Sequence, residues 1–259
     1  MHELLHYLLY QKWKKQMKLQ QLLSYTRKMI DDYDMIQNGD RIGVGISGGK
    51  DSLALLYALA SLSKFHPANF TVYGITVDLG FENQDFEIIK KFCNKLQVPY
   101  SIVNTQIAPI VFEKRKESNP CSLCSKMRKG ALNEEAKRLG INKIAYAHHM
   151  DDVVETLLLS LFYEGRIHTF EPVTYLEQTE LTLIRPMLYV KERDIIGFCN
   201  KYDLPVAKRA CPVDGHTKRE DIKQLIKMLT KDNPGVKERI FSAIQNGNLE
   251  GWPKLKKNV

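Results

Sequence analysis

The chain lacks any apolar stretch long enough to cross a membrane. Its first residues also lack the basic start and the small-residue cleavage site of a secretory signal peptide. It contains no internal repeat and no low-complexity segment. Because a hydrophobic fraction of 44% and a charged fraction of 26% are typical of folded proteins, we expect a cytoplasmic globular protein with no membrane partner.

Cysteine is scarce, with five in 259 residues. An odd number in a cytoplasmic chain argues against a disulfide framework and favours metal or redox chemistry. Cys93 and Cys199 fall inside predicted helices, and we expect them to pack in the core. The cysteines that remain for chemistry are Cys121, Cys124 and Cys211.

Negative charge is also in short supply, and the formal net charge is +8. In residues 1–28 the only acid is Glu3. The basic residues of that stretch are Lys12, Lys14, Lys15, Lys18, Arg27 and Lys28, and a second basic group is formed by Lys254, Lys256 and Lys257. This distribution predicts either contact with a polyanion or an ordinary solvated helix surface.

Short apolar strands alternate with helices along most of the sequence. We expect strands at 41–46, 70–78, 100–104, 143–147 and 181–185, and helices at 52–63, 84–96, 125–139, 151–163, 191–202, 218–231 and 234–246. This order predicts an α/β fold in which helices cover both faces of a parallel sheet. We divide the chain into an N-terminal helical extension (1–36), an α/β domain (37–190) and a C-terminal helical region (191–259).

In a parallel sheet of this kind, ligands bind at the carboxyl ends of the strands. The first strand runs directly into a segment with two glycines, whose spacing is not that of a Walker A loop. The glycines let the backbone approach an anion, and the helix start that follows offers partial positive charge. We therefore predict a pyrophosphate cradle made by Ser47, Gly48, Gly49, Lys50, Asp51 and Ser52.

Each side chain of this cradle suits nucleotidyl transfer from ATP. Lys50 is expected to neutralise phosphate oxygens, and Asp51 to hold the Mg²⁺ ion that bridges them. The serine hydroxyls are expected to contact the leaving pyrophosphate. At the end of the second strand, Asp78 is expected either to bind a ribose hydroxyl of ATP or to cap the following turn.

The strand at 143–147 ends in two histidines, which are followed after one residue by two aspartates. One aspartate at a helix start is a routine cap, but four such residues at a ligand-facing edge exceed what capping requires. We predict that Asp151 acts on the metal or the reacting nucleotide, that Asp152 caps the helix, and that His148 borders the ATP. Metal ligation by His148 and His149 is the weaker alternative, because adjacent residues usually point in different directions.

Cys121 and Cys124 have the spacing C-x-x-C in an expected loop that ends at a helix start, and Cys211 follows much later. Three thiolates hold a 4Fe–4S cluster incompletely, which leaves one iron free to bind an exogenous sulfide. Two alternatives remain open. One is a structural zinc site with His216 as fourth ligand, and the other is persulfide chemistry at Cys121 or Cys211.

Taken together, these motifs resemble the TtcA/TtuA group of PP-loop ATPases, the iron–sulfur-dependent tRNA thiolation enzymes. The resemblance covers roughly residues 20–250 and is closest on the 2-thiocytidine side of the group. The segments that carry it are Ser47–Ser52, Cys121–Ser125, His148–Thr156, Arg185–Met187 and Cys211-Pro212.

This resemblance implies an ATP-dependent tRNA sulfurtransferase that adenylates a pyrimidine C2 carbonyl and releases pyrophosphate and AMP. Cys121, Cys124 and Cys211 would hold the 4Fe–4S cluster through which sulfur is inserted, Cys211 being needed for catalysis. Arg128 is the basic residue expected to contact the reacting oxygen or the phosphate. The resemblance also implies a sulfur donor, either a cysteine desulfurase or free sulfide, and a homodimer. The product that fits it most closely is 2-thiocytidine at tRNA position 32.

The sequence departs from this group in two places. Many members on the 2-thiocytidine side have a second C-x-x-C where this chain has Cys211-Pro212-Val213-Asp214, and the segment 218–237 is similar to the 2-thiouridine branch. Three alternatives therefore stay open: 2-thiouridine formation, a different PP-loop ligase, and a zinc-stabilised RNA-binding module.

Overall fold

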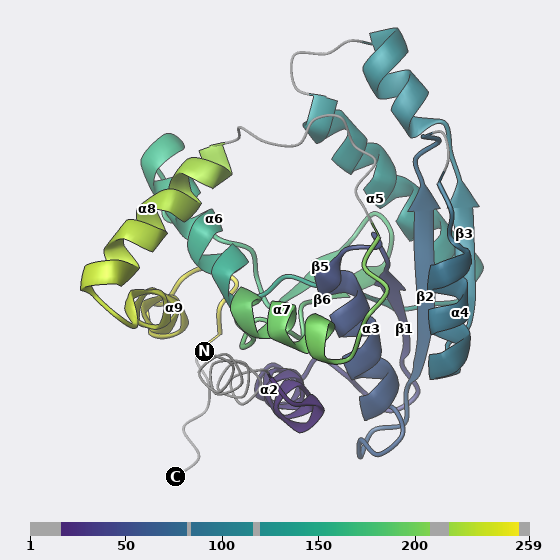
Figure 1. Ribbon diagram of the computed structural model, residues 1–259, viewed down its shortest axis with the longest axis horizontal. Coiled ribbons are helices and arrows are strands. Elements are labelled where there is room, and N and C mark those ends of the chain that lie inside the picture. The colour runs from purple at the N-terminus through teal and green to yellow at the C-terminus, as the bar shows by residue number, and fades with distance from the viewer. Residues whose placement is uncertain (1–16, 82–83, 116–119, 208–217, 254–259) are drawn as a thin grey trace, which may run out of the picture.

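A computed structural model describes residues 17–81, 84–115, 120–207 and 218–253. Within these ranges one six-stranded sheet has the order β3-β2-β1-β4-β6-β5 (Figure 1). The strands are β1 (Arg41–Gly45), β2 (Thr71–Asp78), β3 (Tyr100–Asn104), β4 (Lys143–Ala145), β5 (Val173–Leu176) and β6 (Leu181–Ile184). Strand β5 pairs antiparallel with β6, and the other pairings are parallel.

Helices cover both faces of the sheet, as the alternation in the sequence predicts. The α-helices are α2 (Leu19–Asp32), α3 (Lys50–Leu62), α4 (Glu87–Leu96), α5 (Pro120–Arg138), α6 (Met150–Tyr163), α7 (Glu192–Lys201), α8 (Lys218–Asp232) and α9 (Val236–Asn246). A short π-helix, η1 (Pro109–Arg115), precedes α5. None of the described helices is both long and apolar enough to span a bilayer.

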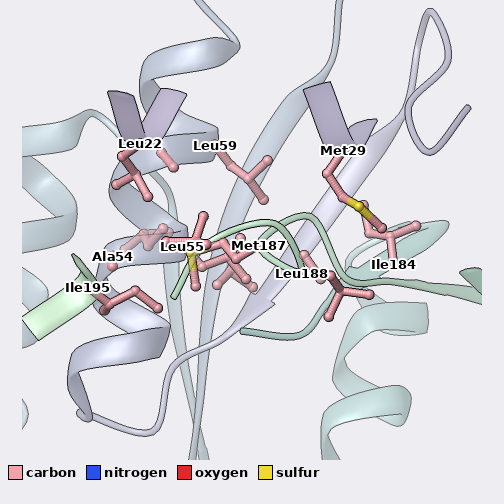
Figure 2. Packing of buried hydrophobic residues seen from close by; sticks show 14 of the residues in the cluster. Leu22, Met29, Ala54, Leu55, Leu59, Ile184, Met187, Leu188 and Ile195 are labelled. Carbon is pink, nitrogen blue, oxygen red and sulfur yellow. The ribbon is translucent and has the colours of Figure 1, made fainter. Parts of the chain in front are cut away.

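The larger hydrophobic core lies on the face of the sheet that α3 covers. Figure 2 shows Leu22 and Met29 of α2, Leu55 and Leu59 of α3, and Ile195 of α7 meeting there. Buried side chains of α8 and α9 belong to the same cluster. Helices on either side of the predicted boundaries at 36 and 190 therefore share one core.

The opposite face of the sheet is covered by α5. Leu132 and Ala136 of α5 pack there against Ile75 and Ile144 of the sheet. Strand β1 alternates between the two cores because successive residues of a strand point to opposite faces. On the α5 side it carries glycine at position 45, where a Cβ would lie 3.2 Å from Leu132 Cδ2. The glycine thus lets α5 approach the strand closely.

One prediction about local structure is wrong. The C-x-x-C segment was expected in a loop, but α5 begins at Pro120 and includes Cys121 and Cys124. Proline suits the first position of a helix, because its φ is already helical and its missing N–H has no partner there. Strand β5 was not among the expected strands, and it adds an antiparallel edge to the otherwise parallel sheet.

Candidate nucleotide site and cysteine pair

The glycine-rich segment connects β1 to the amino end of α3. Gly48 has a φ of +77°, and Gly49 is the N-cap of α3 with an extended backbone and no side-chain cap. An uncapped helix start leaves backbone N–H groups available to an anion. Because Leu53, Leu55 and Leu56 are fully buried in the next two turns, the segment stands on a firmly packed helix.

Gly48 also contacts the chain that leads towards the third cysteine. The Ala207 N–H donates to the Gly48 carbonyl at 3.0 Å, and a Cβ on Gly48 would lie 3.1 Å from the Ala207 Cβ. A larger residue at position 48 would be strained by its positive φ and would crowd Ala207. Cys211 follows four residues later and lies outside the described residues, as does His216.

Serine hydroxyls hold the loop in shape. The Ser47 N–H donates to Ser52 Oγ at 3.2 Å, and the two hydroxyl oxygens are 3.3 Å apart. Ser52 Oγ donates in turn to the Gly49 carbonyl at 2.9 Å. Hydrogen bonds between its first and last residues, Ser47 and Ser52, therefore fix the shape of the predicted cradle.

The Lys50 ammonium is held between two carboxylates. Its Nζ lies 3.1 Å from Asp51 Oδ2 and 3.0 Å from Glu192 Oε1, the latter on α7. Burial would lower the pKa of Lys50, but these two acids outweigh it and the pKa is raised. Lys50 therefore stays charged and ready for phosphate oxygens.

The second carboxylate oxygen of Asp51 has no hydrogen-bond partner although it is buried. His149 Nε2 lies 3.8 Å from this oxygen. A buried oxygen without a partner is costly unless something binds it. Beside a phosphate cradle, a hard cation such as Mg²⁺ suits this oxygen, so the residue fits its predicted role.

At the end of β4, the two histidines have different tasks. His149 is the N-cap of α6, and its N–H donates to Asp152 Oδ2 at 3.0 Å in a capping box. His148 stacks on Phe170 with ring centroids 4.5 Å apart, and its Nδ1 accepts from Arg185 Nε at 3.3 Å. Burial lowers the pKa of His148 to about 4, so its ring is neutral. The N-cap is therefore His149, and Asp152 contributes to the cap from the third helical position by accepting the His149 N–H.

Asp151 is buried against the two helices that follow the sheet. Its Oδ2 accepts from the Glu192 N–H at 2.7 Å at the start of α7, and its Oδ1 is paired with Lys237 of α9. Burial alone would raise the pKa of Asp151, but these contacts outweigh it and the pKa is lowered. Both oxygens are therefore engaged, and direct action on a metal or nucleotide stays a prediction.

Glu155, one turn further along α6, is a buried acid with weak partners. Its carboxylate lies 3.5 Å from Arg219 and 4.0 Å from Lys223, both on α8. Burial raises the pKa of Glu155 to about 7. Because Lys223 also lies 3.8 Å from Glu192, charges of alternating sign connect Lys50 of the cradle to α8.

The side chain of Asp78 forms the turn cap that was one of its two predicted roles. Its Oδ1 accepts from the Gly80 N–H at 2.9 Å at the end of β2. A ribose contact through the other oxygen stays a prediction.

Cys121 and Cys124 lie one turn apart on α5, so they share one helix face. Cys121 is exposed and Cys124 is half-buried. Arg128, one turn beyond Cys124, is exposed, and its charge acts on the Tyr146 hydroxyl beside β4. Cys93 and Cys199 are buried in the core, and burial raises the pKa of each thiol to about 12.

Sequence reasoning missed the residues that the C-terminal helices bring to this region. They are Glu192, Arg219, Lys223 and Lys237. Each is a charged residue on a helix, and such residues usually face solvent. The sequence feature that could have predicted them is the excess of acids at the start of α6. Buried carboxylates need cationic partners, and these had to come from elsewhere in the chain.

Known proteins that are similar in sequence identify the family of this chain. Residues 13–228 match the family model of the PP-loop domain. The chain is 36% identical to the tRNA-cytidine(32) 2-sulfurtransferase of Geobacter sulfurreducens, over 85% of this chain and 86% of that protein. It is 38% identical to the enzyme of the same name from Geotalea uraniireducens, over 85% of this chain and 88% of that protein.

A solved structure confirms the predicted fold. The U34-tRNA thiolase NcsA from Methanococcus maripaludis, determined with its 4Fe-4S cluster, superposes with a TM-score of 0.72 at 23% identity. The match covers 90% of this chain and 83% of that one. By its sequence relatives, the chain belongs to the PP-loop family and, within it, to the family of the tRNA-cytidine(32) 2-sulfurtransferases.

Proposed function

We propose that this chain is an ATP-dependent tRNA sulfurtransferase that converts cytidine 32 of tRNA into 2-thiocytidine. The observation that carries the proposal is that one fold holds both the Ser47–Ser52 cradle at the start of α3 and two cysteines one turn apart on α5. Its curated relatives bear the name of this activity. Because tRNA is the substrate, we expect the enzyme in the cytoplasm.

Activation of the base is the step that the cradle serves. The C2 carbonyl oxygen of the pyrimidine attacks the α-phosphorus of ATP, and the bond to pyrophosphate breaks. Lys50 and the amides at the start of α3 stabilise the leaving pyrophosphate. Asp51 Oδ1 would hold Mg²⁺, which would neutralise charge on the phosphates.

Other residues orient the two substrates. Arg128 contacts the reacting oxygen or the phosphate, and Asp78 and His148 border the ribose and base of ATP. The neutral His148 accepts from Arg185, which fixes the position of its ring. We propose that Asp151 contributes to catalysis at the same edge of the sheet.

The thiols of α5 fit an iron–sulfur cluster by their chemistry. Cys121 is exposed, Cys124 is half-buried, and one helical turn separates them. Cys121 and Cys124, together with Cys211, would hold a 4Fe–4S cluster, which supplies sulfide beside the activated base. No group of three metal-ligating side chains occurs among the described residues, which do not include Cys211.

Completion of the reaction exchanges oxygen for sulfur. A C–S bond forms at C2 of the base as the C–O bond breaks, and AMP leaves with the oxygen. We propose a cysteine desulfurase or free sulfide as the sulfur source, and a homodimer as the assembled form.

A second candidate is 2-thiouridine formation, because the structural neighbour is a U34-tRNA thiolase. The test is an anaerobic reaction of the iron-reconstituted protein with ATP, Mg²⁺, sulfide and an unmodified tRNA transcript, followed by nucleoside mass spectrometry. We expect 2-thiocytidine at position 32. Appearance of 2-thiouridine alone would instead establish the second candidate, and no thionucleoside with either base would refute both.

A further inference from the structure

Four lysines surround a cavity between α8 and α9. The cavity has a volume of about 300 Å³ and is lined by Lys223, Lys227, Thr230, Lys231 and Lys237. We call it the lysine cavity. It lies on the side of the molecule away from α4 (Figure 1).

The lysines of α8 repel one another. Lys223, Lys227 and Lys231 are four residues apart, so they occupy one helix face, and like charges at this spacing destabilise a helix. In the ranges that the structure covers, neither Lys227 nor Lys231 has a carboxylate within 4.0 Å. Both are exposed. An anion bound in the cavity would offset the repulsion between these lysines.

Two lysines of the cavity form ion pairs with acids of the nucleotide site. Lys237 is paired with Asp151, and Lys223 lies 3.8 Å from Glu192. Glu192 in turn holds Lys50 of the cradle at 3.0 Å. An anion bound at Lys223 would therefore lie two ion pairs away from Lys50 of the cradle.

We propose that the lysine cavity binds backbone phosphates of the tRNA substrate. The row from Lys223 to Lys231 extends about 12 Å along α8, which favours a strand of several phosphates over one small anion. Lysines contact RNA phosphates without reading sequence, so the cavity positions the tRNA and leaves base choice to the site itself. This inference rests on the proposed function.

The test compares two double variants with the same charge change. Lys227→Ala/Lys231→Ala removes the two unpaired lysines of the cavity. Lys91→Ala/Lys95→Ala removes two exposed lysines at the same spacing on α4, at the other side of the molecule. Binding of an unmodified tRNA transcript is measured by filter binding between 50 and 300 mM salt.

We expect the cavity variant to bind tRNA about five- to tenfold more weakly near 0.1 M salt. The slope of log K against log salt should fall by roughly 1.4 to 1.8, because each lost phosphate contact removes about 0.7 to 0.9. The α4 variant should keep the wild-type slope. Binding of ATP and of pyrophosphate should be equal in all three proteins.

Three results would overturn the inference. One is equal tRNA binding by both variants in a protein whose wild type binds and thiolates tRNA. Another is weaker binding of pyrophosphate to the cavity variant without weaker binding of tRNA, which would mark a small-anion site. A third is a change of oligomeric state by sedimentation in the cavity variant alone. By contrast, a wild type that neither binds nor thiolates tRNA would refute the proposed function itself.

Discussion

Asp51 combines a buried, unpartnered oxygen with a position inside the phosphate cradle. We expect Asp51→Ala to reduce tRNA-dependent pyrophosphate release by at least about 100-fold, because the bridging Mg²⁺ loses its ligand. ATP binding measured without Mg²⁺ should change little. The control is Asp31→Ala, which removes an exposed acid of α2. Normal turnover in Asp51→Ala would exclude the metal role.

Glu155 makes stability depend on pH in an unusual direction. Its pKa is raised to about 7, so the folded protein holds a proton that the unfolded chain releases near its ordinary value of 4.5. Its contribution is therefore complete below about pH 4.5 and is lost as the pH rises through 7. Above pH 7, Glu155→Gln should be more stable than the wild type by up to about 3 kcal/mol.

The measurement is urea unfolding of both proteins at pH 5 and pH 8. Taking the difference between variant and wild type removes the opposite effect of His148, whose lowered pKa stabilises the fold as the pH rises from about 4. Arg219 and Lys223 are partly exposed and can be hydrated when their acid is gone. An unchanged difference between the two pH values would contradict the assignment.

Among the secondary-structure elements, α7 depends on a residue of α6 for its start. Asp151 accepts from the Glu192 N–H and pairs with Lys237 of α9. Asp151→Asn should therefore lower the free energy of unfolding by about 1–3 kcal/mol, whereas Glu220→Gln on exposed α8 surface should have little effect. Urea unfolding measures both. Wild-type stability combined with lost activity would instead support direct catalysis by Asp151.

The elements that could be predicted are those with a local pattern. Ser47–Ser52 joins a buried strand to a buried helix, and its glycines and charges mark it without any knowledge of partners. A loop was expected for the C-x-x-C segment because the residues just before it favour a turn. Proline also suits the first position of a helix, and Pro120 begins α5. Strand β5 has only four residues and is defined as a strand by its pairing with β6, which the local sequence does not reveal.

Partners separated by long stretches of chain left no such pattern. Lys50 and Glu192 lie 142 positions apart in the sequence yet form an ion pair. The order of strands predicted that Asp51, Asp78 and Asp151 lie at one edge of the sheet. It did not predict that helices from α7 to α9 supply cations that pair with acids there. Tertiary packing decides those contacts, and a single sequence does not display it.

For the whole molecule, metal content distinguishes the cluster from a structural zinc. We expect about four iron and four sulfide per chain after anaerobic purification, and a brown colour. Cys121→Ser/Cys124→Ser and Cys211→Ala should lose the cluster and sulfur insertion but still bind ATP. Cys199→Ser is the matched control, because Cys199 is buried in the core. One zinc per chain without iron would contradict this prediction.

The contacts of the cradle also set the order in which a newly made chain becomes competent. The cradle follows the first strand, but its partners at Glu192 and Ala207 belong to the last third of the sequence. Chains emerge from the ribosome amino end first, at about 5–20 residues per second. A nascent chain that already exposes Ser47–Ser52 therefore waits about 8–30 seconds for Ala207. The loop that is synthesised early is among the last parts of the protein to be finished.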